Sequence, residues 1–361
     1  MLIATAADLH LSPFIWTSHR AIVGDAYYAL GLITRELLNL REQHPDETIV
    51  FVIPGDIFDS TTPDPYTEKI FKDNINVLRL QKIHVLTIQG NHEYHAKTAR
   101  ATLFDTVPLS DTPLIIDGVK FCGIDFTAST EELHEKVSVI PECDYLAMHT
   151  SFRHLLGFED KWQIEKDDIP GHIKNVLVGD IHKQSRVTNE EGVHIVSPGS
   201  THPRDVAEIN GGHGVYVFSH EAGITTGEWH NVEPRKFYIA SVMDENDLAR
   251  LRNLEVTQTS ASGLPSVIIL TVVNDLYKQA VVIAEGKGVL VVSKGALRPM
   301  MPDEQVAVQT EIPPLPACLP MVLNAKQEPE PFALLEQLLT TGDPEAVLDA
   351  EYNKFTGKET V

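Results

Sequence analysis

Five short segments carry residue types that bind metal ions, and each follows an apolar stretch. They are Asp8-Leu9-His10, Gly55-Asp56-Ile57-Phe58-Asp59, Gly90-Asn91-His92-Glu93, Met148-His149-Thr150 and Gly179-Asp180-Ile181-His182. Carboxylates, imidazoles and an amide gathered in one place can hold two cations, which clamp a phosphoryl group and activate water. A single segment of this kind is more often a turn or a helix cap. All five together predict a two-metal hydrolytic site.

The apolar stretches before these segments predict short buried strands. They run over Leu2 to Ala7, Thr48 to Ile53, Ile83 to Ile88, Tyr145 to Met148 and Val176 to Val178. Between the first three strands, Ile22 to Leu40 and Pro65 to Leu80 have apolar residues at the spacing of a helix with one buried face. Strands that alternate with helices predict an α/β fold in which ligands bind at the carboxyl ends of the strands. The five segments stand at those ends.

The composition is that of a globular protein without a membrane anchor. Of the 361 residues, 43% are hydrophobic and 22% are charged, which is enough for one large domain and one or two smaller ones. No stretch approaches the roughly 18 to 20 apolar residues that cross a bilayer. The three cysteines, Cys122, Cys143 and Cys318, have no metal-like spacing and fit buried thiols in a reducing compartment. We therefore expect a cytoplasmic protein that does not enter membranes.

The net charge of −22 argues against tight, autonomous binding to nucleic acid. The charge is uneven, because residues 301–361 hold eleven acidic side chains against three lysines. Two divalent ions in an active site would also cancel local negative charge. The acidity therefore does not exclude a nuclease.

The five segments resemble the signature of the calcineurin-like metallophosphoesterases. The resemblance covers about residues 1 to 235, and within that superfamily the chain is most similar to the SbcD-type nuclease subunit of DNA double-strand-break repair. Two stretches carry this finer likeness, the form Gly55-Asp56-Ile57-Phe58-Asp59 and the turn Val196-Ser197-Pro198-Gly199-Ser200-Thr201. The resemblance implies a layered β-sheet core flanked by helices.

The resemblance also implies a role for each residue of the signature. One ion would be held by Asp8, His10 and His182, and the other by Asn91, His149 and Asp180, with Asp56 bridging the two. His92 would not coordinate; it would stabilise the phosphoryl charge or protonate the leaving oxygen. The mixed ligand set suits two Mn²⁺ ions, or Mg²⁺ as the second choice. Asp59 and Glu93 are expected to orient histidines, with simple loop or cap roles as the alternative.

One position departs from the family pattern. The family motif usually reads Gly-His-x-His where this chain reads Gly179-Asp180-Ile181-His182. Either Asp180 adds a third carboxylate and makes a tighter, harder site, or it is too short to reach the ion and the site is weak. Among residues that could contact substrate, we expect Arg153, Arg204 and His202, against the alternative that the two arginines lie on a solvated surface.

Beyond the phosphoesterase segment the chain changes character. Residues 236–298 alternate strands and helices and resemble a small α/β capping domain, with an unrelated accessory domain as the alternative. Residues 299–330 form a Pro-rich linker, and residues 331–361 a helical tail. The resemblance implies that this tail binds an SbcC-type coiled-coil ATPase, although docking on the chain's own domains is an equal alternative. Formation of a homodimer through the early helices is left open.

The whole pattern predicts a Mn²⁺-dependent DNA phosphodiesterase that acts as an exonuclease, with endonuclease activity left open. It would be the nuclease subunit of an SbcC/SbcD-like repair or recombination complex. Two alternatives stay open at the level of the sequence. One is a phosphoesterase for small phosphodiesters or phosphoproteins, because the ligand set alone does not choose the substrate. The other is a non-catalytic scaffold, which retention of His92 and nearly all ligand types disfavours.

Overall fold

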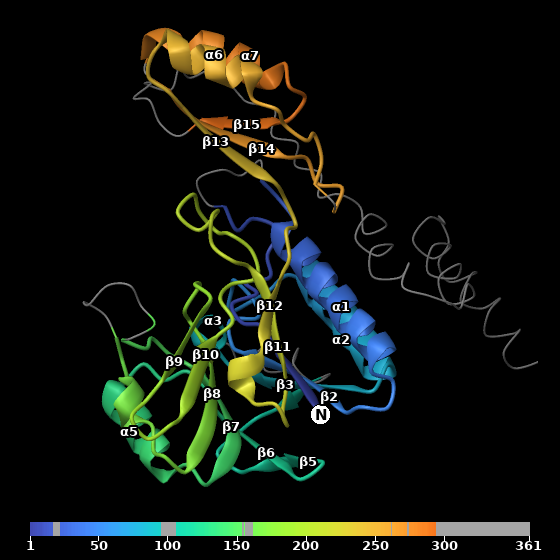
Figure 1. The fold of residues 1–361 in the computed structure, drawn as a ribbon, viewed down its shortest axis with the longest axis vertical. Helices are drawn as coiled ribbons and strands as arrows, with labels where there is room; N and C mark the ends of the chain where they lie inside the picture. The colour runs from blue at the N-terminus through green and yellow to red at the C-terminus, as the bar shows by residue number, and fades with distance from the viewer. Residues whose placement is uncertain are drawn as a thin grey trace, which may run out of the picture.

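The computed structural model describes residues 1–16, 22–94, 106–153, 155, 162–260, 262–272 and 274–293. This part of the chain is a mixed α/β protein with two six-stranded sheets and one three-stranded sheet (Figure 1). The predicted fold class, a layered sheet core flanked by helices, is confirmed. The predicted linker at 299–330 and tail at 331–361 lie outside the described residues.

The first sheet contains three of the predicted strands. In spatial order its strands are β12 (Glu228–Asn231), β11 (Gly214–Ser219), β1 (Leu2–Thr5), β2 (Ile49–Pro54), β3 (Ile83–Ile88) and β4 (Val107–Pro108). β1 to β4 run parallel, whereas β11 and β12 are antiparallel to their neighbours. The carboxyl ends of β1, β2 and β3 therefore meet at one edge of the sheet.

The second sheet supplies the other two predicted strands. Its strands, again in spatial order, are β5 (Leu114–Ile116), β6 (Val119–Ile124), β7 (Cys143–His149), β8 (Ile173–Gly179), β10 (His194–Ser197) and β9 (Ser185–Thr188). The four inner strands are parallel and the two outer ones antiparallel. β7 and β8 again end with the polar segments found in the sequence.

The two sheets pack face to face, and helices cover their outer faces. Alternate residues of β2 show this, because Val50 and Val52 contact the second sheet while Phe51 and Ile53 pack toward the helices. Helices α1 (Asp25–Gln43) and α2 (Pro65–Leu80) cover the first sheet, and α5 (Thr130–Val139) covers the second. The core is thus a helix, sheet, sheet, helix stack (Figure 1).

The sequence sets where α2 begins. Asp64 is the N-cap and its side chain accepts hydrogen bonds from the amides of Tyr66 and Thr67, while Pro65 needs no donor at the first helical position. Helix α2 therefore has the bounds that the sequence predicts. α3 (Asn91–Tyr94) is a single turn, and short 3₁₀ helices lie at Lys166–Asp168, Ile224–Thr226 and Asn274–Leu276.

The third sheet belongs to a small α/β unit. Its parallel strands are β13 (Phe237–Val242), β14 (Val267–Val272) and β15 (Leu290–Ser293), with α6 (Glu245–Asn253) and α7 (Tyr277–Glu285) packed on one face. On the other face, Phe237 stacks on Trp16 with ring centroids 5.1 Å apart. Arg235 and Asp25 form a buried ion pair of 2.8 Å just before this unit. The predicted alternation of strands and helices is thus present in the described residues between 236 and 293, and these elements contact the larger unit.

None of the helices in the described part of the chain is both long and apolar enough to cross a membrane.

Candidate active site

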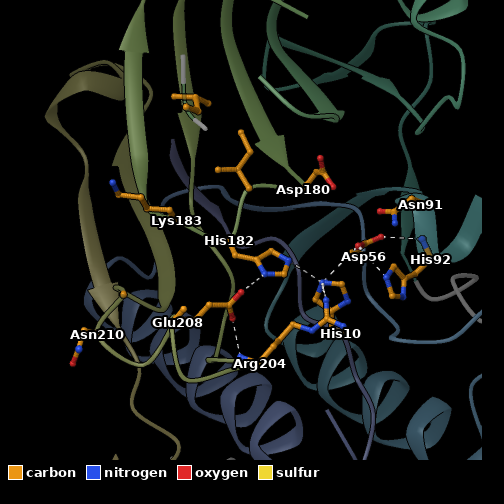
Figure 2. A pocket seen from close by; sticks show the side chains of 14 residues that line it. His10, Asp56, Asn91, His92, Asp180, His182, Lys183, Arg204, Glu208 and Asn210 are labelled. Carbon is orange, nitrogen blue, oxygen red and sulfur yellow. Dashed lines mark hydrogen bonds and ion pairs between the residues drawn. The ribbon is translucent and has the colours of Figure 1, made fainter. Parts of the chain in front are cut away.

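Four of the five predicted segments supply residues that line one cavity, and the fifth places His149 next to Asp56, which lines it. The strands β1, β2, β3, β7 and β8 end around it, and its volume is about 750 Å³. Figure 2 shows His10, Asp56, Asn91, His92, Asp180 and His182 turned toward one another around this space. His10 and His182, which lie 172 residues apart in the sequence, are therefore neighbours.

The backbone is strained at the points where these side chains leave the strands. Asp8, His10, Asp56 and Asp180 have φ angles of 53°, 40°, 49° and 77°. Residues other than glycine adopt this left-handed region only occasionally, at a cost of about 1–3 kcal/mol each, and such residues cluster at functional sites. Four of them in one place indicate that the fold maintains the position of these side chains against local preference.

Asp8, His10 and His182 form the first group that could hold a metal ion. Their candidate ligand atoms all lie within 4.8 Å of one another. The Nε2 atoms of His10 and His182 face each other at 3.2 Å, and the buried Oδ2 of Asp8 has no hydrogen-bond partner. An unpaired carboxylate oxygen and two opposed nitrogens are unfavourable together unless a cation or a proton lies between them. The residues present thus fit a metal ion.

Asp56 and His149 form a second group, again with Asp8 within 4.8 Å. Nδ1 of His149 donates to the Pro54 carbonyl at 2.8 Å, so its Nε2 faces the site, 3.4 Å from Asp56 Oδ1. The terminal amide atom of Asn91 that faces Asp56 and His149 lies 3.0 and 3.1 Å from the two carboxylate oxygens of Asp56. An NH₂ group there would donate to the carboxylate, whereas the carbonyl oxygen would need a cation. Donors of this kind therefore fit a metal ion here too.

Asp180 lies at the edge of this second group. Its Oδ1 is 4.0 Å from Nε2 of His149, and its backbone amide donates to Asp8 Oδ1 at 3.0 Å. Two ligands on opposite sides of one ion are about 4.2 Å apart for bonds of about 2.1 Å. The carboxylate is thus within reach of an ion shared with His149.

His92 is held with one nitrogen facing the cavity. Its Nδ1 lies 2.8 Å from the backbone carbonyl of Asp59, to which it donates, and its backbone amide donates to Asp56 Oδ1 at 3.1 Å. Nε2 is consequently the atom left for chemistry, 3.9 Å from Asp56 Oδ2. Asp59 also contacts a second histidine, with Oδ1 3.5 Å from Nδ1 of His10.

Glu93 has the loop role that was the alternative to orienting a histidine. Its buried carboxylate accepts hydrogen bonds from the backbone amides of Asp56, Phe58 and Gly90 at 2.8 to 3.1 Å. It thus ties the loop after β2 to the start of α3 instead of orienting a histidine. Burial, together with the charge of Asp56, raises the pKa of Glu93 to about 7.

The predicted substrate contacts fall in three different environments. Arg204 lines the cavity, and its guanidinium donates to Asp59 Oδ1 at 2.7 Å and to Nε2 of His10 at 3.0 Å. Arg153 instead pairs with Glu165 at 2.6 Å, over the ring of Trp162, and does not line the cavity. His202 is completely buried and does not line the cavity either. Of the three, only Arg204 is placed where a substrate could be bound directly.

Glu208 and Lys183 line the cavity without having been predicted as site residues (Figure 2). Glu208 accepts a hydrogen bond from Nδ1 of His182 at 2.7 Å and another from the Arg204 amide at 2.8 Å. No motif surrounds Glu208 in the sequence. The available signal was its position four residues after Arg204, which was predicted to contact substrate.

The surroundings of two buried histidines of the site, His10 and His149, shift their pKa values in opposite directions. Burial, and then the positive charge of Arg204, holds the pKa of His10 well below its usual value, so this ring is the neutral form that binds metal. Burial would lower the pKa of His149 as well, but the carboxylates of Asp56 and Asp8 raise it to about 10. Burial also raises the pKa of Asp180 to about 6, and Asp8 adds to this effect.

Comparison with known proteins gives the same family as the residues. Among curated proteins, the chain is 26% identical to the DNA double-strand break repair protein Mre11 of Sulfurisphaera tokodaii over 55% of this chain, and 26% identical to that of Saccharolobus solfataricus over 59%. These matches span 56% and 62% of the length of the two relatives. The predicted resemblance to SbcD-type nucleases agrees with these Mre11 relatives.

Two solved structures show weaker likeness. TT1561 of Thermus thermophilus is 12% identical with a TM-score of 0.40, covering 64% of this chain and 99% of that one. A dimetal phosphatase from Danio rerio is 10% identical with a TM-score of 0.39, covering 60% and 91%. Neither likeness is close enough to support an argument about function. The sequence model of the calcineurin-like phosphoesterases, however, matches residues 1–222, which include every residue that lines the cavity. The chain therefore belongs to the calcineurin-like phosphoesterase family.

Proposed function

We propose that this protein is a Mn²⁺-dependent DNA phosphodiesterase, an exonuclease that also cuts internally, and the nuclease subunit of a complex with an SbcC-type ATPase. The observation that carries the proposal is that Asp8, His10, Asp56, His149 and His182 form two overlapping groups able to hold metal ions, beside a cavity lined by His10, Asp56 and His182, in a calcineurin-like phosphoesterase. The printed names of the two Mre11 relatives, both DNA double-strand break repair proteins, support DNA as the substrate.

Two ions would be held by the ligand sets that the sequence suggested. Asp8, His10 and His182 would hold one, and His149, Asn91 and Asp180 the other, with Asp56 between them. When bound, two such ions neutralise phosphoryl charge and supply a nucleophilic water. Mixed carboxylate, imidazole and amide donors suit Mn²⁺ better than an all-oxygen calcium site.

His92 would supply the proton that the leaving oxygen needs. Its Nδ1 proton is fixed on the Asp59 carbonyl at 2.8 Å, so Nε2 is the atom that gains and loses the reacting proton. With that proton in place, Nε2–H can donate to the phosphoryl oxygen and then to the leaving group. A group that acts this way contributes about 10²- to 10⁴-fold to the rate.

Arg204 would bind a phosphate next to the scissile one. Its guanidinium is shared between Asp59 and Nε2 of His10. If His10 uses that Nε2 to hold a metal ion, it no longer accepts from Arg204, and the freed arm of the guanidinium can bind a phosphate oxygen. The arginine would thus change partners when the site is loaded.

The test is degradation of end-labelled linear DNA by the purified chain with Mn²⁺. His92→Ala should lower the rate about 10²- to 10⁴-fold without loss of fold, whereas His84→Ala, an exposed histidine on β3, should leave it unchanged. A small phosphodiester such as bis(p-nitrophenyl) phosphate serves as the second substrate. Hydrolysis of the small ester alone, even after addition of a coiled-coil ATPase, would favour the small-phosphodiester enzyme. No hydrolysis of either substrate would favour a scaffold.

The partner proposals are tested separately. The small α/β unit at 236–298 would act as the capping domain, and the tail at 331–361 would bind the ATPase. Deletion of residues 331–361 should abolish co-purification with an SbcC-type ATPase while hydrolysis of the small ester continues. Sedimentation of the full chain decides whether it is a dimer.

A further inference from the structure

We propose that Glu208 is a positioning residue that sets the tautomer of His182 and the place of Arg204 at the same time. Nothing in the predicted signature assigns it. The inference rests on the proposed metal site, because its effect would pass through a metal ligand. The inference is based on the Glu208 carboxylate, in which one oxygen accepts a hydrogen bond from His182 and the other accepts one from Arg204 (Figure 2).

The first contact fixes which nitrogen of His182 faces the site. Oε1 of Glu208 accepts the Nδ1 proton of His182 at 2.7 Å, so the lone pair lies on Nε2. That Nε2 is directed at Nε2 of His10, 3.2 Å away. A metal-binding histidine that donates its other proton to a carboxylate is both oriented and made more basic.

Two other site histidines donate to a different kind of partner. Nδ1 of His149 donates to the carbonyl of Pro54, and Nδ1 of His92 to the carbonyl of Asp59. A neutral carbonyl fixes the ring but adds less basicity than a carboxylate. Among these three rings, His182 is the one whose Nδ1 proton is accepted by a carboxylate.

The second contact joins the metal site to the substrate arginine. Oε2 of Glu208 accepts the backbone amide of Arg204 at 2.8 Å, and this arginine reaches over to Asp59 Oδ1 at 2.7 Å. The Glu208 carboxylate therefore fixes the backbone of Arg204 relative to the proposed metal ligand His182. Loss of Glu208 should disturb both.

The loop backbone holds Glu208 in place before any ligand binds. Asp205 Oδ1 accepts the amides of Ala207 and Glu208 at 2.7 and 3.2 Å. The Glu208 carbonyl in turn accepts from Gly211 N at 2.8 Å and from Nε2 of His213 at 2.9 Å. The backbone of Glu208 is thus fixed by hydrogen bonds within its own loop, none of which involves His182.

The experiment compares Mn²⁺ binding to the full chain by calorimetry in wild type, Glu208→Ala and Glu208→Gln. Glu208→Ala should weaken one of the two ions about 10- to 100-fold and leave the other unchanged. Glu208→Gln keeps a neutral acceptor for His182, so it should lose less affinity than the alanine variant. Glu190→Ala, an exposed glutamate of the β9–β10 turn, is the matched control.

A spectroscopic reading separates positioning from loss of structure. At two Mn²⁺ per chain, wild type should show the paramagnetic resonance signal of a coupled pair, and Glu208→Ala that of an isolated ion. A merely structural role would instead weaken both ions equally in the alanine and glutamine variants. If Glu208→Ala does not fold, the glutamine variant decides the question.

Two results overturn the inference in different ways. Wild-type affinity for both ions in folded Glu208→Ala would show that Glu208 does not act on the site, and the proposed function would stand. Failure of the wild-type chain to bind Mn²⁺ would remove the proposed function itself and the role of Glu208 with it.

Discussion

Metal binding should release a proton from His149. Nδ1 of this buried ring donates to the Pro54 carbonyl, so the additional proton of the metal-free ring is on Nε2. Burial alone would make that proton weakly held, but Asp56 Oδ1 lies 3.4 Å away, and the carboxylates raise the pKa of His149 to about 10. A cation that uses Nε2 must displace this proton.

The size of the effect follows from the solution pH. At pH 8 the solution is about two pH units below the pKa of His149, so the proton lowers the apparent affinity of this ion about 100-fold, or about 3 kcal/mol. This pH is chosen because Glu93 and Asp180, with pKa values of about 7 and about 6, are by then ionised. The apparent affinity should rise nearly tenfold between pH 8 and pH 9 as the competing proton is lost.

Calorimetry of Mn²⁺ binding in two buffers of different ionisation enthalpy measures the protons released. His149→Gln should release about one proton fewer than wild type, while the exposed His84→Gln should match it. Burial would lower the pKa of His182, but Glu208 raises it; the His149→Gln and His84→Gln variants leave this ring unchanged, so its contribution is common to all of them. A binding enthalpy that is the same in both buffers would refute the reasoning, as would an unchanged proton count in His149→Gln.

Three further changes test other parts of the structure. Asp180→His should not strengthen binding of the second Mn²⁺ ion in a calorimetric titration, because Oδ1 of Asp180 already lies within ligand reach, 4.0 Å from Nε2 of His149. Clearly tighter binding in the variant would show that the carboxylate is too short to reach the ion. Asp25→Ala should cost about 3–5 kcal/mol of unfolding free energy in urea, since it leaves the buried Arg235 unpaired; a loss below about 1 kcal/mol would contradict a buried pair. Gly90→Ala should reduce Mn²⁺ affinity and cost about 1–3 kcal/mol, because the new Cβ would overlap the carboxylate and amide of Asp56; binding as in wild type would show that the loop yields.

The elements around the site could be predicted because each has a strong local signal. β2 is a continuous apolar run, β3 is rich in apolar and β-branched residues, and α2 has both a cap and an apolar face, so their bounds were predicted to within a residue. The helix α5 was missed because only Leu133 and Val137 of its ten residues are buried. β9 has four residues and no buried one, which leaves almost no periodicity to detect. Pairing with β10 creates that strand, and sequence alone does not show the partner.

The residues of the site also fall into two groups, those with a local signal in the sequence and those without one. The residues that follow strands were identified because strand ends meet at one edge in a parallel sheet. Glu208 escaped because its partners, His182 and the Arg204 amide, are brought to it by a loop without repeat or apolar pattern. For Glu93 the sequence could not decide between orienting a histidine and a loop role, because its contacts are backbone amides that any sequence possesses. Residue types thus indicate the candidate ligands, whereas the hydrogen bonds that hold them come from loop conformation.

The aspartate at position 180 also bears on how a protein of net charge −22 could act on DNA. With Asp8 and Asp56 it would bring three carboxylates to two divalent ions, leaving one positive charge where a histidine at 180 would leave two. Arg204 is itself paired with Asp59, so it adds little to the attraction of a distant polyanion. Nonspecific affinity for DNA depends on many cations meeting phosphates, and this site offers few. If the proposed function holds, we therefore expect weak DNA binding by the chain alone and cleavage of DNA that the proposed ATPase partner holds.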